Sequence, residues 1–454
     1  MSRLSLRPHT QPAAEPAQRP TRRWLGHLRR PARTGLVALG LALIAAALFT
    51  CYLHLSRTVP ANADGASIAL QASSMLHGNL LLHGWVLSDV SFYTTELPQY
   101  MLIEAIHGLS PDVMHIAAAL TYTVLVLLAA WLAKGRATGR EGVVRGALAA
   151  GIMVAPPIGS VFVLMLEPDH VGSTVPVLLL AILLDRAGRR WFVPVLAFLL
   201  VVWALVADQV ILITAVLPLI LVALAHGYRR AFARRNAARR PWFEAGLLAA
   251  ALVGVFVADR VVALIRASGG YRVYPVNHQL SYFDRLPHNA LMTLQGFLVL
   301  FGANFAGHRA GLLAAIGLLH LVGVVLVGWA VAAALRRFGR LVISMQLLTV
   351  SVCVTVLAYL LGPNALSGQS SREIASVLPL GAALAGRMLA GRIRRAQLVP
   401  AMAAVLAVYL GGLVFYATRP AAPAENQALA GWLSSHRLRY GLTTSYWTAN
   451  STTA

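Results

Sequence analysis

Charged side chains are scarce in this sequence. Asp, Glu, Lys and Arg together make up 12% of its 454 residues, whereas 58% are hydrophobic. Soluble globular domains carry about 25% charged residues. This composition argues against a soluble protein and predicts one that crosses a membrane several times.

Cysteine and the common nucleotide and hydrolase motifs are also lacking. The two cysteines, Cys51 and Cys353, both fall in apolar segments, and neither has the spacing of a disulfide framework or a metal site. No GxxxxGK[ST], HExxH or GxSxG motif occurs. These absences argue against an ATPase, a zinc protease of this type and an α/β-hydrolase.

Acidic residues are few, with 16 Asp and Glu against 38 Lys and Arg, so the formal net charge is +22. The arginines occur in short clusters between apolar segments, where the positive-inside rule expects them. No basic stripe with interleaved aromatics is present, so nucleic acid is not an expected partner.

Apolar runs predict about eleven transmembrane helices, because a crossing takes about 20 apolar residues. The predicted spans are residues 35–55, 112–133, 146–166, 168–184, 191–207, 210–226, 242–265, 310–335, 341–361, 374–391 and 398–417. The expected fold is therefore an all-α polytopic membrane bundle.

The distribution of basic residues predicts the orientation. With the N-terminus in the cytoplasm, 28 of the 38 Lys and Arg residues fall inside, and 12 of the 16 acids fall outside. We expect three parts: a disordered basic cytoplasmic segment (1–33), a transmembrane domain (34–417) and a short extracytoplasmic tail (418–454). The tail should contain a helix near 424–436 and a strand-like segment, Tyr440–Trp447.

The two longest connectors, 56–111 and 266–309, are both predicted to lie outside. Each contains apolar helical runs that are too short to cross with the right parity, at 68–76, 100–109 and 290–305. Helices lying in the membrane interface account for these runs. The outer face is therefore the expected location of function.

The stretch "PANADGASIALQASSMLHGNLLLHGW" starts the first long connector and contains one carboxylate, Asp64. Asp before Gly65 and a helical run is a common helix N-cap. The alternative is a functional carboxylate at the membrane surface. One side chain can do both.

"LEPDHVGS", residues 166–173, is the densest polar cluster beside a predicted span. Glu167, Asp169 and His170 fall within four residues at the start of the span 168–184. Acids at a helix start are favoured by the helix dipole, which is a purely structural explanation. They could also hold a divalent metal such as Mg or Mn, directly or through a bound pyrophosphate.

"SGQSSREIASVLPLG", residues 367–381, opens the span 374–391. Ser370 and Glu373 have the spacing of a capping box, which explains the glutamate without function. Arg372 opposes the helix dipole and lies on the outer side, so it is a candidate phosphate-binding residue. A contact with a lipid headgroup is the alternative.

The adjacent pair Asp259 and Arg260 falls in the outer part of the span 242–265. Charges within spans are costly and usually face a bundle interior or a wet cavity, which makes Arg260 a candidate substrate-binding residue. Asp208, in contrast, is expected to form only the outer turn between two spans.

This arrangement resembles the GT-C superfamily of polytopic glycosyltransferases, which includes protein O-mannosyltransferases and lipid A aminosugar transferases. The likeness consists of the topology of residues 35–417, the acid in "NADGASIALQ", the "EPDH" cluster, and the "REIASVLPLGAALAGR" span. A single acid stands at 64, where some members carry a pair.

The resemblance implies a sugar transfer from a polyprenyl-phosphate donor, with inversion, to an extracytoplasmic glycan, lipid or protein acceptor. It implies catalytic roles for Asp64 and Asp169. Substrate binding would fall to Glu167, His170, Arg372 and Arg260. A non-enzymatic membrane scaffold, a transporter-like protein and an inactive relative are the alternatives.

Overall fold

The structure is a computed structural model. It describes residues 24–156, 158–165, 170–232, 242–275, 279–306, 309–395, 397–423, 426–438 and 445–453. The chain divides into two compact units, Met1–Ala47 and Leu48–Ala454. The second unit contains every element after the first helix.

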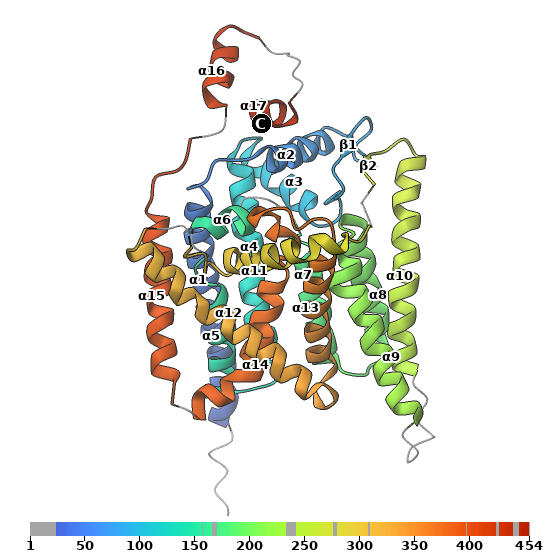
Figure 1. Cartoon of the computed structure of the whole chain (residues 1–454), viewed down its shortest axis with the longest axis vertical. Helices are drawn as coiled ribbons and strands as arrows, with labels where there is room; N and C mark the ends of the chain where they lie inside the picture. The colour runs from blue at the N-terminus through green and yellow to red at the C-terminus, as the bar shows by residue number, and fades with distance from the viewer. Residues whose placement is uncertain are drawn as a thin grey trace, which may run out of the picture. The chain divides into compact units, whose positions relative to one another are not determined.

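The described residues are almost entirely helical (Figure 1). The helices are α1 (Trp24–Ser56), α2 (Ala63–Leu76), α3 (Glu96–His107), α4 (Asp112–Lys134), α5 (Gly139–Met153), α6 (Ile158–Met165), α7 (Thr174–Ala187), α8 (Phe192–Ala207), α9 (Leu217–Phe232), α10 (Trp242–Ala267), α11 (Leu286–Leu300), α12 (Leu312–Arg336), α13 (Ile343–Leu361), α14 (Val377–Arg395), α15 (Val399–Ala417), α16 (Gln427–Ser435) and α17 (Tyr446–Thr453). A π-helical turn, η1 (Leu212–Val216), and three 3₁₀ segments, η2 (Phe283–Arg285), η3 (Phe338–Arg340) and η4 (Gly368–Ile374), complete them.

Seven helices among the described residues are long and apolar enough to cross a membrane. They are Gly35–Ser56, Asp112–Lys134, Leu212–Arg230, Trp242–Ala267, Ala314–Arg336, Ile343–Leu361 and Val399–Ala417. The all-α prediction is confirmed, and these helices indicate a membrane protein. By length and composition alone, the described residues account for seven of the eleven predicted crossings.

The other four predicted spans are shorter or more polar than expected. The predicted span 146–166 divides into α5 and α6, because Pro156 cannot donate a helical hydrogen bond and disfavours the helical conformation before it. Helix α7 begins at Thr174 and has 14 residues, and α8 has 16. Helix α14 ends in three arginines.

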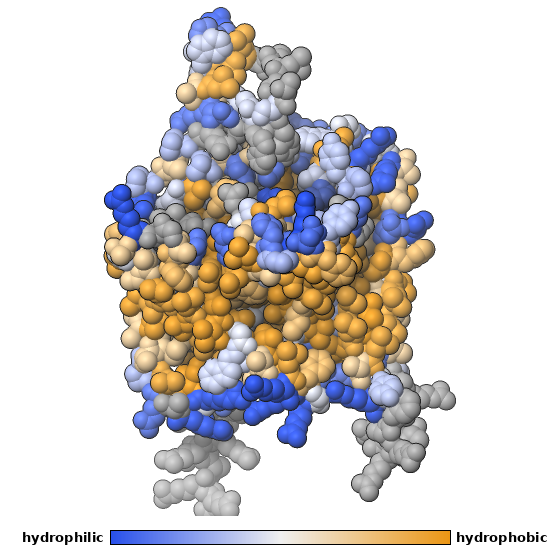
Figure 2. Space-filling view, in the orientation of Figure 1, coloured by the Kyte–Doolittle hydropathy of each residue, from blue (hydrophilic) through white to orange (hydrophobic). Residues whose placement is uncertain are grey.

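The three short runs predicted to lie at the interface are helical, as α2, α3 and α11. In Figure 1, α2 and α11 run crosswise to the upright α10 and α15. On the visible face of the second unit, Figure 2 shows a hydrophobic band with hydrophilic residues above and below it.

A short parallel ladder joins the two long connectors. Strand β1 (Val86–Leu87) pairs with β2 (Arg272–Val273) in the register Val86 to Arg272. The sequence analysis did not predict this pairing. It predicted instead a strand-like segment at Tyr440–Trp447, which is wrong where the structure describes it: Tyr446 and Trp447 begin α17.

Three acids predicted to lie inside pair with arginines. Arg387 Nη2 donates to Asp185 Oδ1 at 2.7 Å, linking α14 to α7. Arg189 donates twice to buried Glu244, at 2.5 and 2.9 Å, and thereby joins the α7–α8 turn to α10. Glu141 accepts from Arg145 within α5 at 2.5 Å. Removing one partner would leave the other charge buried and unpaired at Asp185 and Glu244, so these two acids have a structural role. Glu141 is half-exposed, and its pair contributes less.

Helix α14 packs very closely against α4 and α5 at Gly386. A Cβ at this position would lie 2.5 Å from the carbonyl oxygen of Arg145 and 2.8 Å from Cβ of Ala133. A Cβ at Gly391, one turn further along the same helix, would meet nothing within 4 Å. The α4–α5–α14 contact therefore requires glycine at the first position only.

We predict that Gly386→Ala lowers the thermal unfolding temperature of the detergent-solubilised protein. Overpacking of this kind costs about 1–3 kcal/mol. Gly391→Ala is the matched control and should leave the unfolding temperature unchanged or raise it, because Ala favours a helix over Gly by about 1 kcal/mol. Equal effects of the two substitutions would contradict the packing at Gly386.

Candidate functional site

His170 lies buried between two carboxylates that come from distant parts of the chain. Its Nδ1 is 2.7 Å from Oδ2 of Asp208, and its Nε2 is 3.3 Å from Oε2 of Glu373. His170 is 8% exposed and Asp208 1% exposed. We call these three residues the carboxylate–histidine cluster.

Helix ends position the cluster. His170 stands in the turn before α7 with a left-handed φ of 50°, which is uncommon for a residue other than glycine. Asp208 is the C-cap of α8, and its Oδ1 accepts the backbone N–H of Val210 at 2.9 Å. Glu373 belongs to η4. Each charged group thus stands where a helix begins or ends.

The three groups reinforce one another's charge. Burial alone would lower the pKa of His170, but the charges of Asp208 and Glu373 outweigh it and raise this pKa well above its ordinary value. Burial alone would raise the pKa of each carboxyl, but His170 keeps both below their ordinary values. The cluster therefore contains an imidazolium and two carboxylates at neutral pH.

A fourth ionisable group, Glu96 at the start of α3, lies close to the cluster. Glu96 is buried. Its carboxylate lies so close to Gly172 that a Cβ atom on residue 172 would overlap the carboxylate. Burial raises the pKa of Glu96 to about 8, an effect that the hydrogen bond from Thr95 opposes and the charge of Asp208 augments. Glu96 is therefore mainly a neutral acid at pH 7.

A cavity of 270 Å³ opens beside the cluster and contacts both long connectors. Asp89 and Val90 line it from the first connector, and Gln279 and Leu280 from the second. The remaining walls are the cluster itself, Gln209, Val210, Leu212 and Ile213, and the C-terminal end of α13 with its following turn. The volume is close to the lower limit of about 300 Å³ for small-molecule sites.

Backbone hydrogen bonds hold the first connector over this cavity. The N–H groups of Ser91 and Phe92 donate to the carbonyl oxygen of Ala207, at 3.0 and 3.1 Å. Thr94 Oγ1 donates to the carbonyl oxygen of Trp203 at 2.6 Å. The last turn of α8 therefore anchors the segment that carries Asp89.

The second connector is tied to the end of α13. The N–H of Ser281 donates to the carbonyl oxygen of Leu361 at 2.8 Å, and its hydroxyl donates to that of Gly362 at 2.7 Å. Buried Asn289 donates to the same Gly362 carbonyl at 3.0 Å. The cavity walls are thus fixed from two directions.

Only part of the predicted site gathers at the cavity. His170 belongs to the cluster. The charge of Arg372 lowers the pKa of Glu373, but Arg372 is not among the described residues that line the cavity. Glu167 and Asp169, the two acids just before His170, lie outside the described residues.

Asp64 stands apart from this group. It is the second residue of α2 and is half-buried, and it is not among the described residues that line the cavity. The N-cap interpretation of Asp64 is wrong, because Asn62 caps the helix by accepting the N–H of Gly65 at 2.9 Å.

Arg260 faces away from the bundle. Its guanidinium pairs with Asp259 at 2.6 Å, and both side chains are more than 60% exposed, at 63% and 64%. The expectation that these charges face an interior or wet cavity is wrong. The charges of Arg260 and Asp259 neutralise each other. The guanidinium of Arg260 also lies over the ring of Phe256.

Asp208, Glu373 and Asp89 were not predicted as functional residues from the sequence. It explained Glu373 by a capping box with Ser370, but the box at η4 forms between Ser367 and Ser370, which frees Glu373 to pair with His170. Asp208 was interpreted only as a turn residue. The available signal was a lone acid directly following an apolar helix of 16 residues.

The donor set does not fit a divalent metal. Both ring nitrogens of His170 are already paired with carboxylates, so an imidazolium there has no free lone pair to offer. Among the described residues no group of three or more His, Cys, Asp or Glu has metal-binding geometry.

A scan against protein-family models finds no match for this sequence, and a search of curated proteins finds none that is significantly similar.

We predict that Glu96→Gln flattens the pH dependence of stability. The folded pKa of about 8 lies above the ordinary 4.5, so this group stabilises the fold fully below about pH 4.5 and loses that effect as the pH rises through 8. Glutamine does not ionise. The thermal unfolding temperature should therefore fall less steeply with rising pH in the variant than in the wild-type protein.

Glu141→Gln is the control, since Glu141 pairs with Arg145 on α5, away from the cluster. It should keep the wild-type profile. If Glu96→Gln also keeps the wild-type profile, Glu96 is not a neutral buried acid.

Proposed function

We propose that this protein is a membrane glycosyltransferase that transfers a sugar from a polyprenyl-phosphate donor to an extracytoplasmic acceptor. In this proposal the chain crosses the membrane eleven times, with the shorter α5–α6 pair, α7, α8 and α14 completing the seven apolar helices. The N-terminus is cytoplasmic, the C-terminus extracytoplasmic, and the cavity opens outward.

The observation that carries the proposal is the cavity beside the carboxylate–histidine cluster. It is lined by acids and amides together with apolar side chains, and both long connectors contribute to it. A lipid-linked sugar presents hydroxyls, a phosphate and a hydrocarbon chain. A site at the end of a membrane bundle with mixed walls suits this combination.

Asp89 is our candidate general base, in the role first expected for Asp64. It is an exposed acid of the first connector and faces the cavity, so it can reach an incoming hydroxyl. Asp208 and Glu373 are each engaged with His170, so they are less free to accept a proton. The cluster would instead keep its charges fixed beside the reacting groups.

The proposed transfer forms one bond, breaks another and moves one proton. The acceptor oxygen attacks the anomeric carbon of the donor and loses its proton to Asp89, while the bond from that carbon to the phosphate oxygen breaks. The leaving polyprenyl phosphate carries the released electron pair. Arg372, next to Glu373, would stabilise its negative charge. Attack opposite the leaving group inverts the anomeric configuration.

The test is lipid analysis of a strain that lacks the gene. It should accumulate a polyprenyl-linked sugar, and the wild-type gene should clear it. We predict that Asp89→Asn lowers turnover by about 10²–10⁴-fold, the usual effect of removing a general base. Asp284→Asn is the matched control, because Asp284 is an exposed acid of the second connector that is not among the cavity-lining residues.

Asp64→Asn is tested in parallel, since Asp64 is the residue that the family resemblance implies. Loss of transfer in Asp64→Asn, with full transfer in Asp89→Asn, would keep the activity but reject the base assigned here. A deletion strain with no accumulated lipid-linked sugar would reject the transferase and favour the membrane scaffold.

A further inference from the structure

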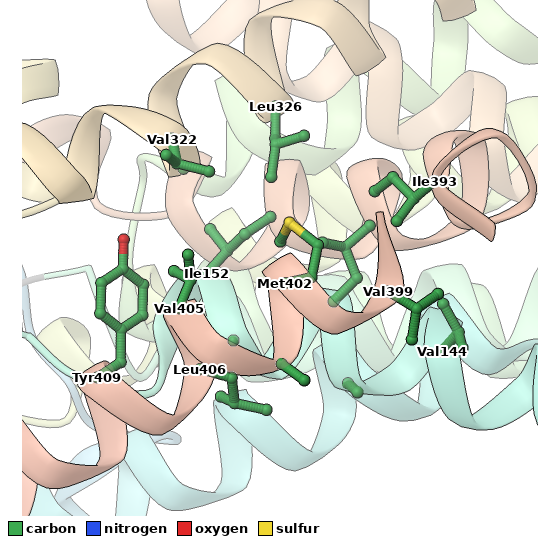
Figure 3. Close-up of a pocket in the computed structure, with 15 residues that line it drawn as sticks. Val144, Ile152, Val322, Leu326, Ile393, Val399, Met402, Val405, Leu406 and Tyr409 are labelled. Carbon is green, nitrogen blue, oxygen red and sulfur yellow. The ribbon is translucent and has the colours of Figure 1, made fainter. Parts of the chain in front are cut away.

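A second hollow, distinct from the cavity, lies between α5, α12, α14 and α15. Its volume is 120 Å³. Fifteen residues line it, and all are apolar apart from Tyr409 and two glycines, Gly151 and Gly323. Figure 3 shows Val322, Leu326 and Ile393 on one side and Val144, Leu406 and Tyr409 on the other. We call it the apolar cleft.

The cleft presents only hydrocarbon to an occupant. Its one polar group, the Tyr409 hydroxyl, already donates to the carbonyl oxygen of Leu319 at 2.9 Å. The ring of Tyr409 stacks on His320 with centroids 4.3 Å apart. A polar ligand would find little to replace its hydrogen bonds to water here, because the Tyr409 hydroxyl has only its acceptor capacity left. A methylene chain has no hydrogen bonds to lose.

The cleft extends along helices long enough to cross a membrane. Helices α12 and α15 are both long and apolar enough. Helix α15 is the less buried of the two, with 17% of its most apolar segment buried in the structure. One end of the cleft is formed by Val144, Ile393 and Val399. These residues lie near the start of α5, near the end of α14 and at the start of α15. This end therefore lies at a terminus of all three helices.

That end carries positive charge. Arg394 and Arg395 follow Ile393 and are exposed, and no carboxylate of a described residue is paired with either. The guanidinium of Arg392 lies 5.6 Å above the ring of Trp329, which is 47% exposed. Tryptophan and arginine together are typical of the depth of lipid headgroups.

We infer that the apolar cleft binds one acyl chain of an anionic membrane phospholipid, whose phosphate group lies against Arg394 and Arg395. The charge favours an anionic headgroup over a zwitterionic one, because each basic residue near a membrane surface attracts anionic lipid. The volume of the cleft is below the range of about 300–1,000 Å³ for small-molecule sites, so it suits a segment of a hydrocarbon chain. This lipid would hold α15 against the bundle.

The test is native mass spectrometry of the full chain released from nanodiscs that contain equal amounts of phosphatidylglycerol and phosphatidylcholine. The wild-type protein should retain one phosphatidylglycerol. Ala403→Trp fills the cleft and should lower this retention about tenfold. Ala404→Trp is the matched control, because Ala404 is exposed on the same helix but does not line the cleft, and it should retain the lipid.

A second pair of variants tests the headgroup and does not depend on Ala403→Trp folding. The double substitution Arg394→Gln/Arg395→Gln should abolish the preference for phosphatidylglycerol, and Arg336→Gln/Arg337→Gln, at the end of α12, should preserve it. Equal retention of both lipids by the wild-type protein overturns the inference. Unchanged retention of phosphatidylglycerol by Ala403→Trp also overturns it, as does an isoprenoid bound to the protein in place of the phospholipid.

Discussion

The ion pairing of His170 with Asp208 and Glu373 is the constraint on which this end of the bundle depends. It joins the turn before α7, the end of α8 and η4, three segments far apart in the sequence. Each group would be costly to bury alone, and together they become tolerable because opposite charges and hydrogen bonds offset the loss of water. Residues on either side of this cluster form the cavity walls, so its geometry sets the geometry of the proposed site.

The two ends of the bundle use charge differently. At one end the paired acids Asp185 and Glu244 meet arginines and tie helices together, as ordinary structural ion pairs. At the other end, acids meet a histidine or, as with Glu96, are buried without a charged partner and held neutral. The proposed general base, Asp89, belongs to neither kind, because it is exposed and lines the cavity beside the cluster.

The all-α architecture and the three short helices of the long connectors, α2, α3 and α11, could be predicted from the sequence, because apolar residues at helical spacing leave a strong local signal. The four short spans were harder to judge, since Pro156 and the arginines ending α14 change helix length without changing the apolar character of their neighbours. The site was least predictable. Asp208 and Glu373 each had a sufficient local explanation, as a turn and a cap, and only the three-dimensional pairing with His170 gives them another role.

The measurement that tests this account most directly is the protonation state of His170, read from nitrogen chemical shifts of protein with ¹⁵N-labelled histidine. The signal is assigned by its loss in His170→Gln. At a pH about one unit above the ordinary histidine pKa of about 6.5, we expect His170 to remain an imidazolium with both nitrogens protonated. A neutral imidazole at that pH would contradict the paired cluster and the cavity geometry built on it.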